Sequence, residues 1–260
     1  MRRVSSYVAR TSPVVVVRAF RRLGLRQAIA LLGMYAGLRR FRECTFTSRG
    51  VAFPCVSPVD VATLVTIFLR EDYGRVREGA RVLDVGANVG LFALWSIWCG
   101  AARVDAFEPE PENYRCLVRA TSRFPVTTHE LAIADASGTK TIALIGSTDN
   151  TIVVEGDSRW PTAPVQCSTL DEVLRSVGQV DVLKMDIEGG EYHALYPSNL
   201  SPAVVKSVRM EYHVKGGTDE DPSGLTDFFL RRGFRLTRQV VISPMSGLLW
   251  FDSQAGSSAE

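Results

Sequence analysis

The chain has 260 residues, of which 46% are hydrophobic and 22% charged, as in an ordinary globular protein with apolar surface to bury. Its formal net charge is only +2, but residues 1–50 contain 11 arginines and one acidic residue, so they carry about +10 and the remainder about −8. An acidic body argues against a nucleic-acid-binding enzyme, and we expect no nucleic-acid partner.

Cysteine usage and N-terminal hydropathy indicate the compartment. The five cysteines are odd in number and form no CxxC pair, which is typical of reduced, mostly buried residues. An uncharged run at residues 27–38 has about 12 residues, whereas a transmembrane helix needs about 20. We therefore expect a cytoplasmic protein without a transmembrane segment.

The uneven charge suggests a division of the chain. We expect residues 1–50 to form a basic helical extension, with one or two helices at about 18–42 that dock on the rest and cover one side of its cleft. Residues 51–255 are expected to form one domain, and residues 256–260 a disordered tail.

From residue 81 onward, strand-like and helix-like segments alternate. Strands are predicted at 81–85, 103–107 and about 126–133, and helices at 91–99 and 112–122. Alternation of this length predicts an α/β fold, with a doubly wound, mostly parallel sheet and helices on both faces.

The pattern changes at about residues 138–168, where three short β-like pieces are separated by turn-forming residues and predict a β-rich insertion. These pieces lie at 139–145, 151–154 and 165–168. Alternation then resumes, with helices predicted at 169–176, 191–196 and 223–232, and strands at 180–185, 207–212, 235–242 and 247–251.

The first strand runs into the sequence D-V-G-A-N-V-G at residues 84–90. Gly86 and Gly90 would let the chain turn tightly into the helix and let a ligand lie against the backbone. The spacing D-x-G-x-x-x-G differs from the dinucleotide pattern G-x-G-x-x-G. S-adenosylmethionine carries an amino group and a sulfonium, which an acid at Asp84 would suit. We predict that Asp84, Gly86, Asn88 and Gly90 bind this cofactor.

Glu108 ends the second strand, one strand–helix–strand step after Asp84. A carboxylate there can accept hydrogen bonds from both ribose hydroxyls, as in other nucleotide-binding α/β folds. On the next strand, Ala132 and the two residues before it would supply contacts to the edge of the adenine.

Six motifs occur together in one order. They are D-V-G-A-N-V-G at 84–90, F-E-P at 107–109, A-I-A-D at 132–135, T-L-D at 169–171, L-K-M-D-I-E-G-G-E at 183–191 and M-E-Y-H at 210–213. In this combination the chain resembles the FkbM-type methyltransferases over about residues 80–235. The resemblance implies a class I methyltransferase (Rossmann-like) fold, S-adenosylmethionine as methyl donor, and a hydroxyl acceptor on a small-molecule natural product.

The resemblance also suggests particular acceptors. Chain length and the arginine-rich start are similar to the founding enzymes of the family, which methylate the cyclohexyl hydroxyl of tacrolimus- and rapamycin-type macrolides in antibiotic biosynthesis. A sugar hydroxyl is the alternative acceptor.

Methyl transfer to an alcohol requires removal of a proton, and candidates lie at the carboxyl ends of later strands. In one interpretation His213 is the base, oriented by a carboxylate, with Asp186 and Glu211 beside it. In a second, Asp186, Glu188 and Glu211 hold Mg²⁺. In a third, ion pairs merely organise the strand ends, among Lys184, Glu188, Glu191 and Arg209.

Two other classes of protein remain open. One is a catalytically silent protein of the same fold that binds a partner through residues 1–50. The other is an NAD(P) oxidoreductase, although the third glycine of its motif is missing. The site acids are all present, which favours the methyltransferase; oligomeric state is not predicted.

Overall fold

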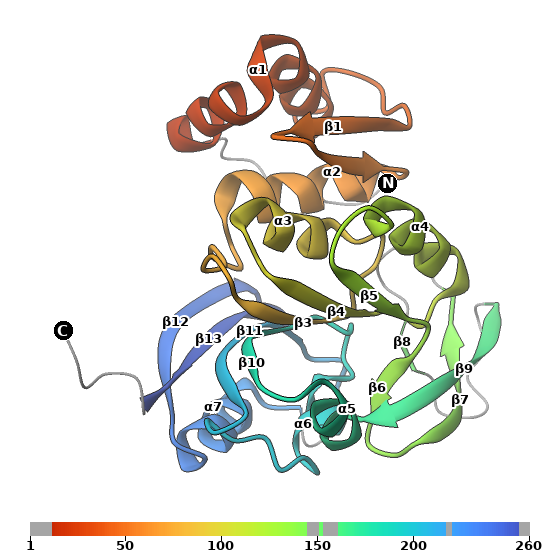
Figure 1. The fold of residues 1–260 in the computed structure, drawn as a ribbon, viewed down its shortest axis with the longest axis vertical. Coiled ribbons are helices and arrows are strands. Elements are labelled where there is room, and N and C mark those ends of the chain that lie inside the picture. Colours follow the sequence, from red (N-terminus) through yellow and green to blue (C-terminus); the bar gives the residue numbers. More distant parts are fainter. Residues whose placement is uncertain (1–11, 145–150, 153–160, 217–219, 255–260) are drawn as a thin grey trace.

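A seven-stranded sheet forms the centre of the protein, for which the computed structural model describes residues 12–144, 151–152, 161–216 and 220–254. Its strands are β3 (Arg81–Val85), β4 (Arg103–Phe107), β5 (Val126–His129), β10 (Val180–Met185), β11 (Val205–His213), β12 (Phe234–Ser243) and β13 (Ser246–Ser253). Their order is β12-β13-β11-β10-β3-β4-β5 (Figure 1). The strands from β5 to β11 are parallel, and β13 is antiparallel to both of its neighbours. The predicted doubly wound, mostly parallel sheet is confirmed.

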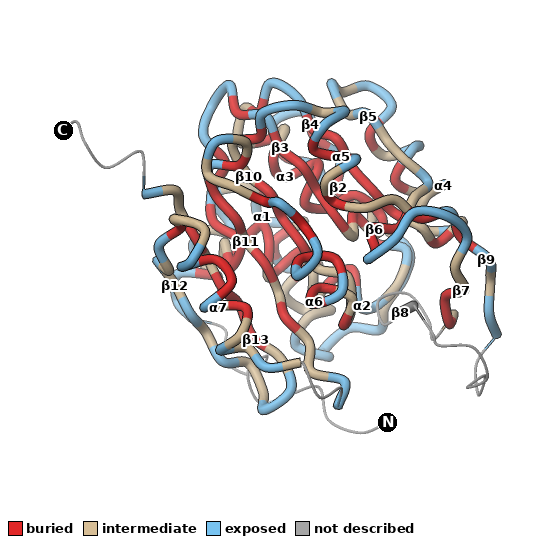
Figure 2. The backbone as a smooth tube through the Cα atoms, turned by 90° about the horizontal axis from the view of Figure 1, so that it is seen from below, coloured by how far each residue is buried: buried red, intermediate tan, exposed pale blue. Residues whose placement is uncertain are grey.

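Helices cover both faces of this sheet. Two of them, α3 (Leu91–Cys99) and α4 (Pro111–Thr121), lie on one face, and three lie on the other face, namely α5 (Leu170–Val177), α6 (Glu191–Leu195) and α7 (Pro222–Arg231) (Figure 1). The central strands are buried, while the surrounding loops are exposed (Figure 2). Strands covered on both faces are largely buried and rich in apolar residues, and β3, β4 and β10 have their predicted bounds.

The N-terminal part adds a further layer outside α3. It consists of α1 (Pro13–Tyr35), the hairpin β1 (Cys44–Ser48) and β2 (Val51–Cys55), α2 (Pro58–Leu64) and the π-helical turn η1 (Val65–Arg70). Phe68 joins the layers, because its ring lies 4.8 Å from Phe53 of the hairpin and 5.5 Å from Trp95 of α3. The hairpin, α2 and η1 were not expected from the sequence. A boundary at residue 50 falls in the turn of that hairpin.

The extension is helical as expected, but α1 starts and ends earlier than residues 18–42. Ser12 caps its start by accepting a hydrogen bond from Val14 N, and Pro13 occupies the first turn, where its missing N–H costs nothing. The helix kinks at Gly24, which has φ 73°. It ends before Gly37, whose φ of 71° suits a helix terminus.

The strand expected at 126–133 is in fact two strands in different sheets. β5 ends at His129, and β6 (Ala132–Ala134) pairs in parallel with β9 (Thr162–Thr169). With β7 (Gly138–Ala143) and β8 (Thr151–Ile152) these form a four-stranded sheet of order β6-β9-β7-β8. The predicted single strand is therefore wrong, because the chain leaves the main sheet to start the β-rich insertion, which lies where it was expected.

Some expectations fall outside the described residues. They concern residues 1–11 of the extension, residues 153–154 of the insertion and the tail at 256–260. Among the helices that are described, none combines the length and apolarity needed to cross a membrane.

Candidate active site

A cavity of about 240 Å³ opens at the carboxyl ends of β3, β4, β10 and β11. It is lined by the loop that follows β3, including Gly86 and Asn88, and by Glu108. Asp186 and Glu211, at the ends of β10 and β11, also line it. The cavity thus lies at the strand ends where ligands bind in open α/β sheets.

The two predicted glycines are required by protein packing. Gly86 has φ 76°, and a Cβ there would lie 1.8 Å from the carbonyl oxygen of Asp186. Gly90 has φ 94°, and its Cβ would lie 2.9 Å from the side chain of Leu117 in α4. Both positions admit glycine alone without rearrangement, and Gly86 also lines the cavity.

Glu108 organises the donor side of the cavity. Its carboxylate accepts hydrogen bonds from Asn88 N at 2.8 Å and from Glu110 N at 2.9 Å. Two oxygens can accept about four hydrogen bonds, so capacity remains for two hydroxyls of a ligand. Burial raises the pKa of Glu108 to about 7, although these two backbone hydrogen bonds oppose the shift.

Asp84 lies beneath the loop that follows β3. Its side chain is fully buried, 3.3 Å from Lys184 Nζ, and within the described chain it is not among the residues that line the cavity. Lys184 also donates a hydrogen bond to the carbonyl oxygen of Gly86 at 2.5 Å. Burial would lower the pKa of Lys184, but the charge of Asp84 outweighs it and raises the pKa. The pair therefore holds the loop that follows β3 in place from the side away from the cavity.

An apolar wall completes the donor side. Ala132 lines the cavity together with its neighbours Leu131 and Ile133 and with Phe107 at the end of β4. An apolar surface beside a carboxylate with spare acceptor capacity suits a ligand with a flat, apolar-faced ring and adjacent hydroxyls.

Asp186, Glu211 and Tyr73 meet at the wall of the cavity. The Tyr73 hydroxyl lies 3.0 Å from Asp186 Oδ2 and 3.1 Å from Glu211 Oε2. Asp186 Oδ1 is buried, with no hydrogen-bond partner among the described residues. Burial, with the negative charge of Asp186, raises the pKa of Glu211 to about 7.

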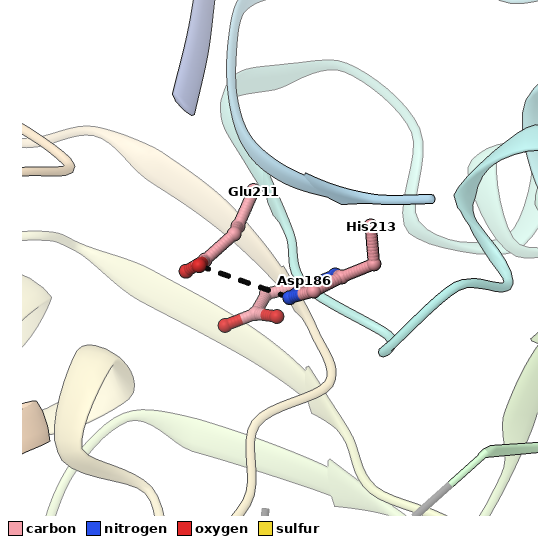
Figure 3. A group of neighbouring side chains, drawn as sticks. All are labelled: Asp186, Glu211 and His213. Atoms are coloured by element: carbon pink, nitrogen blue, oxygen red, sulfur yellow. Dashed lines mark ion pairs between the residues drawn. The ribbon is translucent and has the colours of Figure 1, made fainter. Parts of the chain in front are cut away.

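His213 lies beside these carboxylates but, in the described chain, not on the cavity wall. Figure 3 shows its ring directed toward Glu211 and Asp186. Its Nδ1 is 3.2 Å from Glu191, and its Nε2 is 3.5 Å from Glu188. Burial would lower the pKa of His213, but the hydrogen bond and charge of Glu191 outweigh it and raise the pKa to about 10. A histidine protonated at neutral pH is poorly suited to accept a proton.

The ion pairs expected from the third interpretation are only partly present. Lys184 pairs with Asp84, and Arg209 pairs with Asp252 at 2.9 Å, so neither cation contacts Glu188 or Glu191. Glu191 instead accepts hydrogen bonds from the backbone of the loop between β10 and α6, from Ile187 N at 3.0 Å and Gly189 N at 3.0 Å. It therefore shapes that loop and holds His213.

The group of possible metal ligands differs from the predicted set. Asp186, Glu211 and His213 place ligand atoms within 4.8 Å of one another, whereas Glu188 is outside that group. Mg²⁺ prefers oxygen ligands, and an imidazole suits transition metals better. The described residues therefore fit Mg²⁺ poorly, and we derive no step through it.

Two features of the site were missed from the sequence. Tyr73 follows η1 in a segment without any motif, and Asp60 and Thr66 of the α2–η1 segment also line the cavity. Conversely, none of the described residues before position 51 lines it. The expectation that residues 18–42 cover the cleft is wrong, because α1 packs on the outer side of α2 and η1 (Figure 1).

The strand order and the site define a class I, S-adenosylmethionine-dependent methyltransferase (EC 2.1.1). The chain matches the methyltransferase FkbM domain over residues 84–236, more than half of its length, and it belongs to that family.

Known proteins resemble the chain at low identity. The AMB antimetabolite synthetase AmbE of Pseudomonas aeruginosa is 27% identical over 224 residues, covering 66% of this chain and 10% of that protein, so the chain spans about a tenth of this relative's length. The ribosomal protein L11 methylase of Lactobacillus delbrueckii subsp. bulgaricus is 13% identical, covering 75% of this chain and 80% of its own, with TM-score 0.42. The precorrin-6y C5,15-methyltransferase of Geobacter metallireducens is 12% identical, covering 68% and 81%, with TM-score 0.41.

Proposed function

We propose that the protein transfers a methyl group from S-adenosylmethionine to a hydroxyl of a natural product. The proposal rests on one observation. The same cavity is lined by Glu108, which can accept further hydrogen bonds, and by Asp186, whose Oδ1 has no hydrogen-bond partner among the described residues. Donor-binding and proton-accepting groups thus lie along the same cavity.

The donor side fits the cofactor. Glu108 would accept the ribose hydroxyls, the loop at Gly86 and Asn88 would lie along the ligand, and the wall at Ala132 would contact the adenine. When bound, the cofactor supplies a methyl group already activated by its sulfonium. Asp84 contributes indirectly, by holding Lys184 against the carbonyl of Gly86.

At the acceptor side, Asp186 accepts the single proton that the hydroxyl releases, and Glu211 lies beside it. The Tyr73 hydroxyl lies within hydrogen-bond distance of one oxygen of each carboxylate, which positions both and leaves Asp186 Oδ1 for the acceptor. A positioned base typically contributes about 10²–10⁴-fold in rate. His213, held protonated by Glu191, supplies positive charge beside the carboxylates and is not itself the base.

The best candidate for the acceptor is the cyclohexyl hydroxyl of a tacrolimus- or rapamycin-type macrolide, with a sugar hydroxyl as the alternative. The resemblance to an antimetabolite synthetase supports a natural-product setting. All five cysteines are free, which suits the cytoplasm.

Transfer itself can be tested with trideuteriomethyl-labelled donor and separate pools of desmethyl macrolides and sugars. Intact-mass analysis should find one product heavier by a single labelled methyl group. Donor binding without a labelled product in either pool would instead favour the silent binding protein.

The proton acceptor can be tested with variants and a chelator. Asp186→Asn should lower kcat by about 10²–10⁴-fold with near-normal donor affinity, and His213→Ala should have the smaller effect. Chelator should leave the wild type active. If a chelator abolishes activity and a divalent cation restores it, the metal interpretation is favoured. If His213→Ala is inactive while Asp186→Asn is active, His213 is the base.

A further inference from the structure

A second cavity, of about 560 Å³, lies between the C-terminal half of α1, the segment after it and β1. Four arginines line it, and we call it the arginine cavity: Arg26, Arg39, Arg40 and Arg42. No acidic residue of the described chain lines it. It lies in the N-terminal layer and shares no lining residue with the active-site cavity.

The arginines of this cavity differ from two other arginines of α1. Arg18 and Arg22 face the body of the protein, where both pair with Glu71, at 3.1 Å and 2.5 Å. Among the described residues, no ion pair or hydrogen bond joins the four cavity arginines to another side chain, and all four are exposed. Within the described part of the chain, no ion pair therefore offsets the repulsion among these four charges.

The local backbone gathers these side chains in one place. After α1 ends, the amides of Leu38 and Arg39 both donate to the carbonyl oxygen of Gly33, which folds the segment back on the helix. Gly33 also makes room for Arg39, since a Cβ there would lie 3.1 Å from the Arg39 Cδ atom. The cavity floor is apolar, with Ala30, Met34 and Phe46.

From this arrangement we propose that the arginine cavity binds a phosphoryl group attached to an apolar moiety. Planar guanidinium groups bind phosphate oxygens bidentately, which lysines do not, and every cation that lines the cavity is an arginine. The apolar floor would contact the group that carries the phosphate. Either a soluble phosphate ester or an anionic lipid headgroup provides this chemistry.

Phenyl phosphate is a suitable soluble probe, with uncharged benzyl alcohol as its control, and calorimetry on the full chain gives the affinity. The test variant is Arg26→Gln with Arg42→Gln. Its matched control is Arg115→Gln with Arg123→Gln, which removes the same charge from exposed positions at α4. The test variant should bind phenyl phosphate at least about tenfold more weakly, and the control should bind within about twofold of wild type.

Vesicles separate the two sources of phosphate. Cosedimentation with phosphatidylcholine vesicles containing phosphatidylglycerol, lost in the test variant alone, identifies a lipid headgroup. Phenyl phosphate binding without cosedimentation identifies a soluble ester. The proposal is overturned if wild type binds neither probe, or if both double variants lose binding equally, because the effect is then one of net charge.

Thermal unfolding distinguishes ligand binding from a structural role. Since the four charges repel, the test variant at low salt should have the same Tm as wild type or a higher one, and phenyl phosphate should raise the Tm of wild type and of the control variant but not of the test variant. The conservative variant Arg26→Lys with Arg42→Lys keeps the charge but should still bind more weakly. A lower Tm of the test variant together with unchanged phosphate affinity would contradict the proposal.

Discussion

Glu108 is a buried carboxylate that joins two loops, and we propose that it also binds the cofactor. It joins the loops after β3 and β4 through the amides of Asn88 and Glu110, before any ligand is bound. Its raised pKa means that a fraction of the protein carries a protonated Glu108 at neutral pH. Only the ionised carboxylate accepts hydrogen bonds from both ribose hydroxyls.

Donor affinity should therefore depend on pH. The pKa of Glu108 is about 7, so the dissociation constant of S-adenosylhomocysteine should fall as the pH rises through that value. Between about pH 6 and about pH 8 the affinity should increase roughly tenfold. Glu108→Gln should bind weakly and without this dependence, whereas the exposed Glu112→Gln should behave as wild type. A calorimetric series with no pH dependence in wild type would contradict the assignment.

Tyr73 is predicted to position the two carboxylates. Tyr73→Phe removes the hydroxyl that lies 3.0 Å from Asp186 and 3.1 Å from Glu211. With the carboxylates no longer fixed, kcat should fall by about tenfold while the donor dissociation constant stays within about twofold. Tyr114→Phe is the matched control, since the Tyr114 hydroxyl makes only long contacts of 3.5 Å to Thr128. Equal activity of both variants would remove Tyr73 from the site.

Individual site residues differed in how far the sequence could predict them. Glu108 and Asp186 directly follow strands and Glu211 lies near the end of β11, and strand ends of a parallel sheet converge, so their position was predictable. Tyr73 contacts residues 113 and 138 positions away, and no local pattern encodes that contact. The raised pKa of His213 depends on Glu191, whose orientation is set by the loop between β10 and α6.

At the level of elements, the junction between β3 and α3 depends on Gly86. In Gly86→Ala, the new Cβ would meet the Asp186 carbonyl at 1.8 Å, and φ is also positive. We expect a loss of about 1–2 kcal/mol from the left-handed backbone and a further 1–3 kcal/mol from the overlap, with loss of donor binding. Gly50→Ala has a similar φ of 80° but nothing within 4 Å, so it isolates the backbone cost. Equal Tm values for the two variants would be inconsistent with the packing argument.

The helix α1 should behave as part of the core. Leu31 is fully buried in it, whereas Leu25 of the same helix is 66% exposed. Leu31→Ala should reduce the free energy of unfolding by about 2–5 kcal/mol, and Leu25→Ala should change it by less than about 0.5 kcal/mol. Denaturant titration measures both. If Leu31→Ala unfolds like wild type, α1 is a loosely attached extension.

Elements buried on both faces were predicted best. The strands at 81–85, 103–107 and 180–185 are apolar runs that end at a glycine or an acid, and they agree with the structure residue for residue. The hairpin at 44–55 was missed because its strands are short and Pro54 disfavours a strand. The division between β5 and β6 depends on pairing with β9, about 35 residues later, which no local pattern indicates.

For the whole molecule, the charge asymmetry read from the sequence has a structural counterpart. The described part of the basic segment forms the outermost layer on one face of the sheet. Two of its arginines form ion pairs with Glu71, and four others line the arginine cavity. The active-site cavity lies at the strand ends, lined by carboxylates. The two regions therefore present opposite charge to ligands.

The most direct test of the account is a crystal structure of the full chain with S-adenosylhomocysteine. It should place the ligand in the active-site cavity, with both ribose hydroxyls on Glu108, the adenine against the wall at Ala132, and the sulfur toward Asp186 and Glu211. A ligand bound elsewhere, or one whose ribose does not contact Glu108, would contradict the assignment of the cofactor site and of the carboxylate pair beside it.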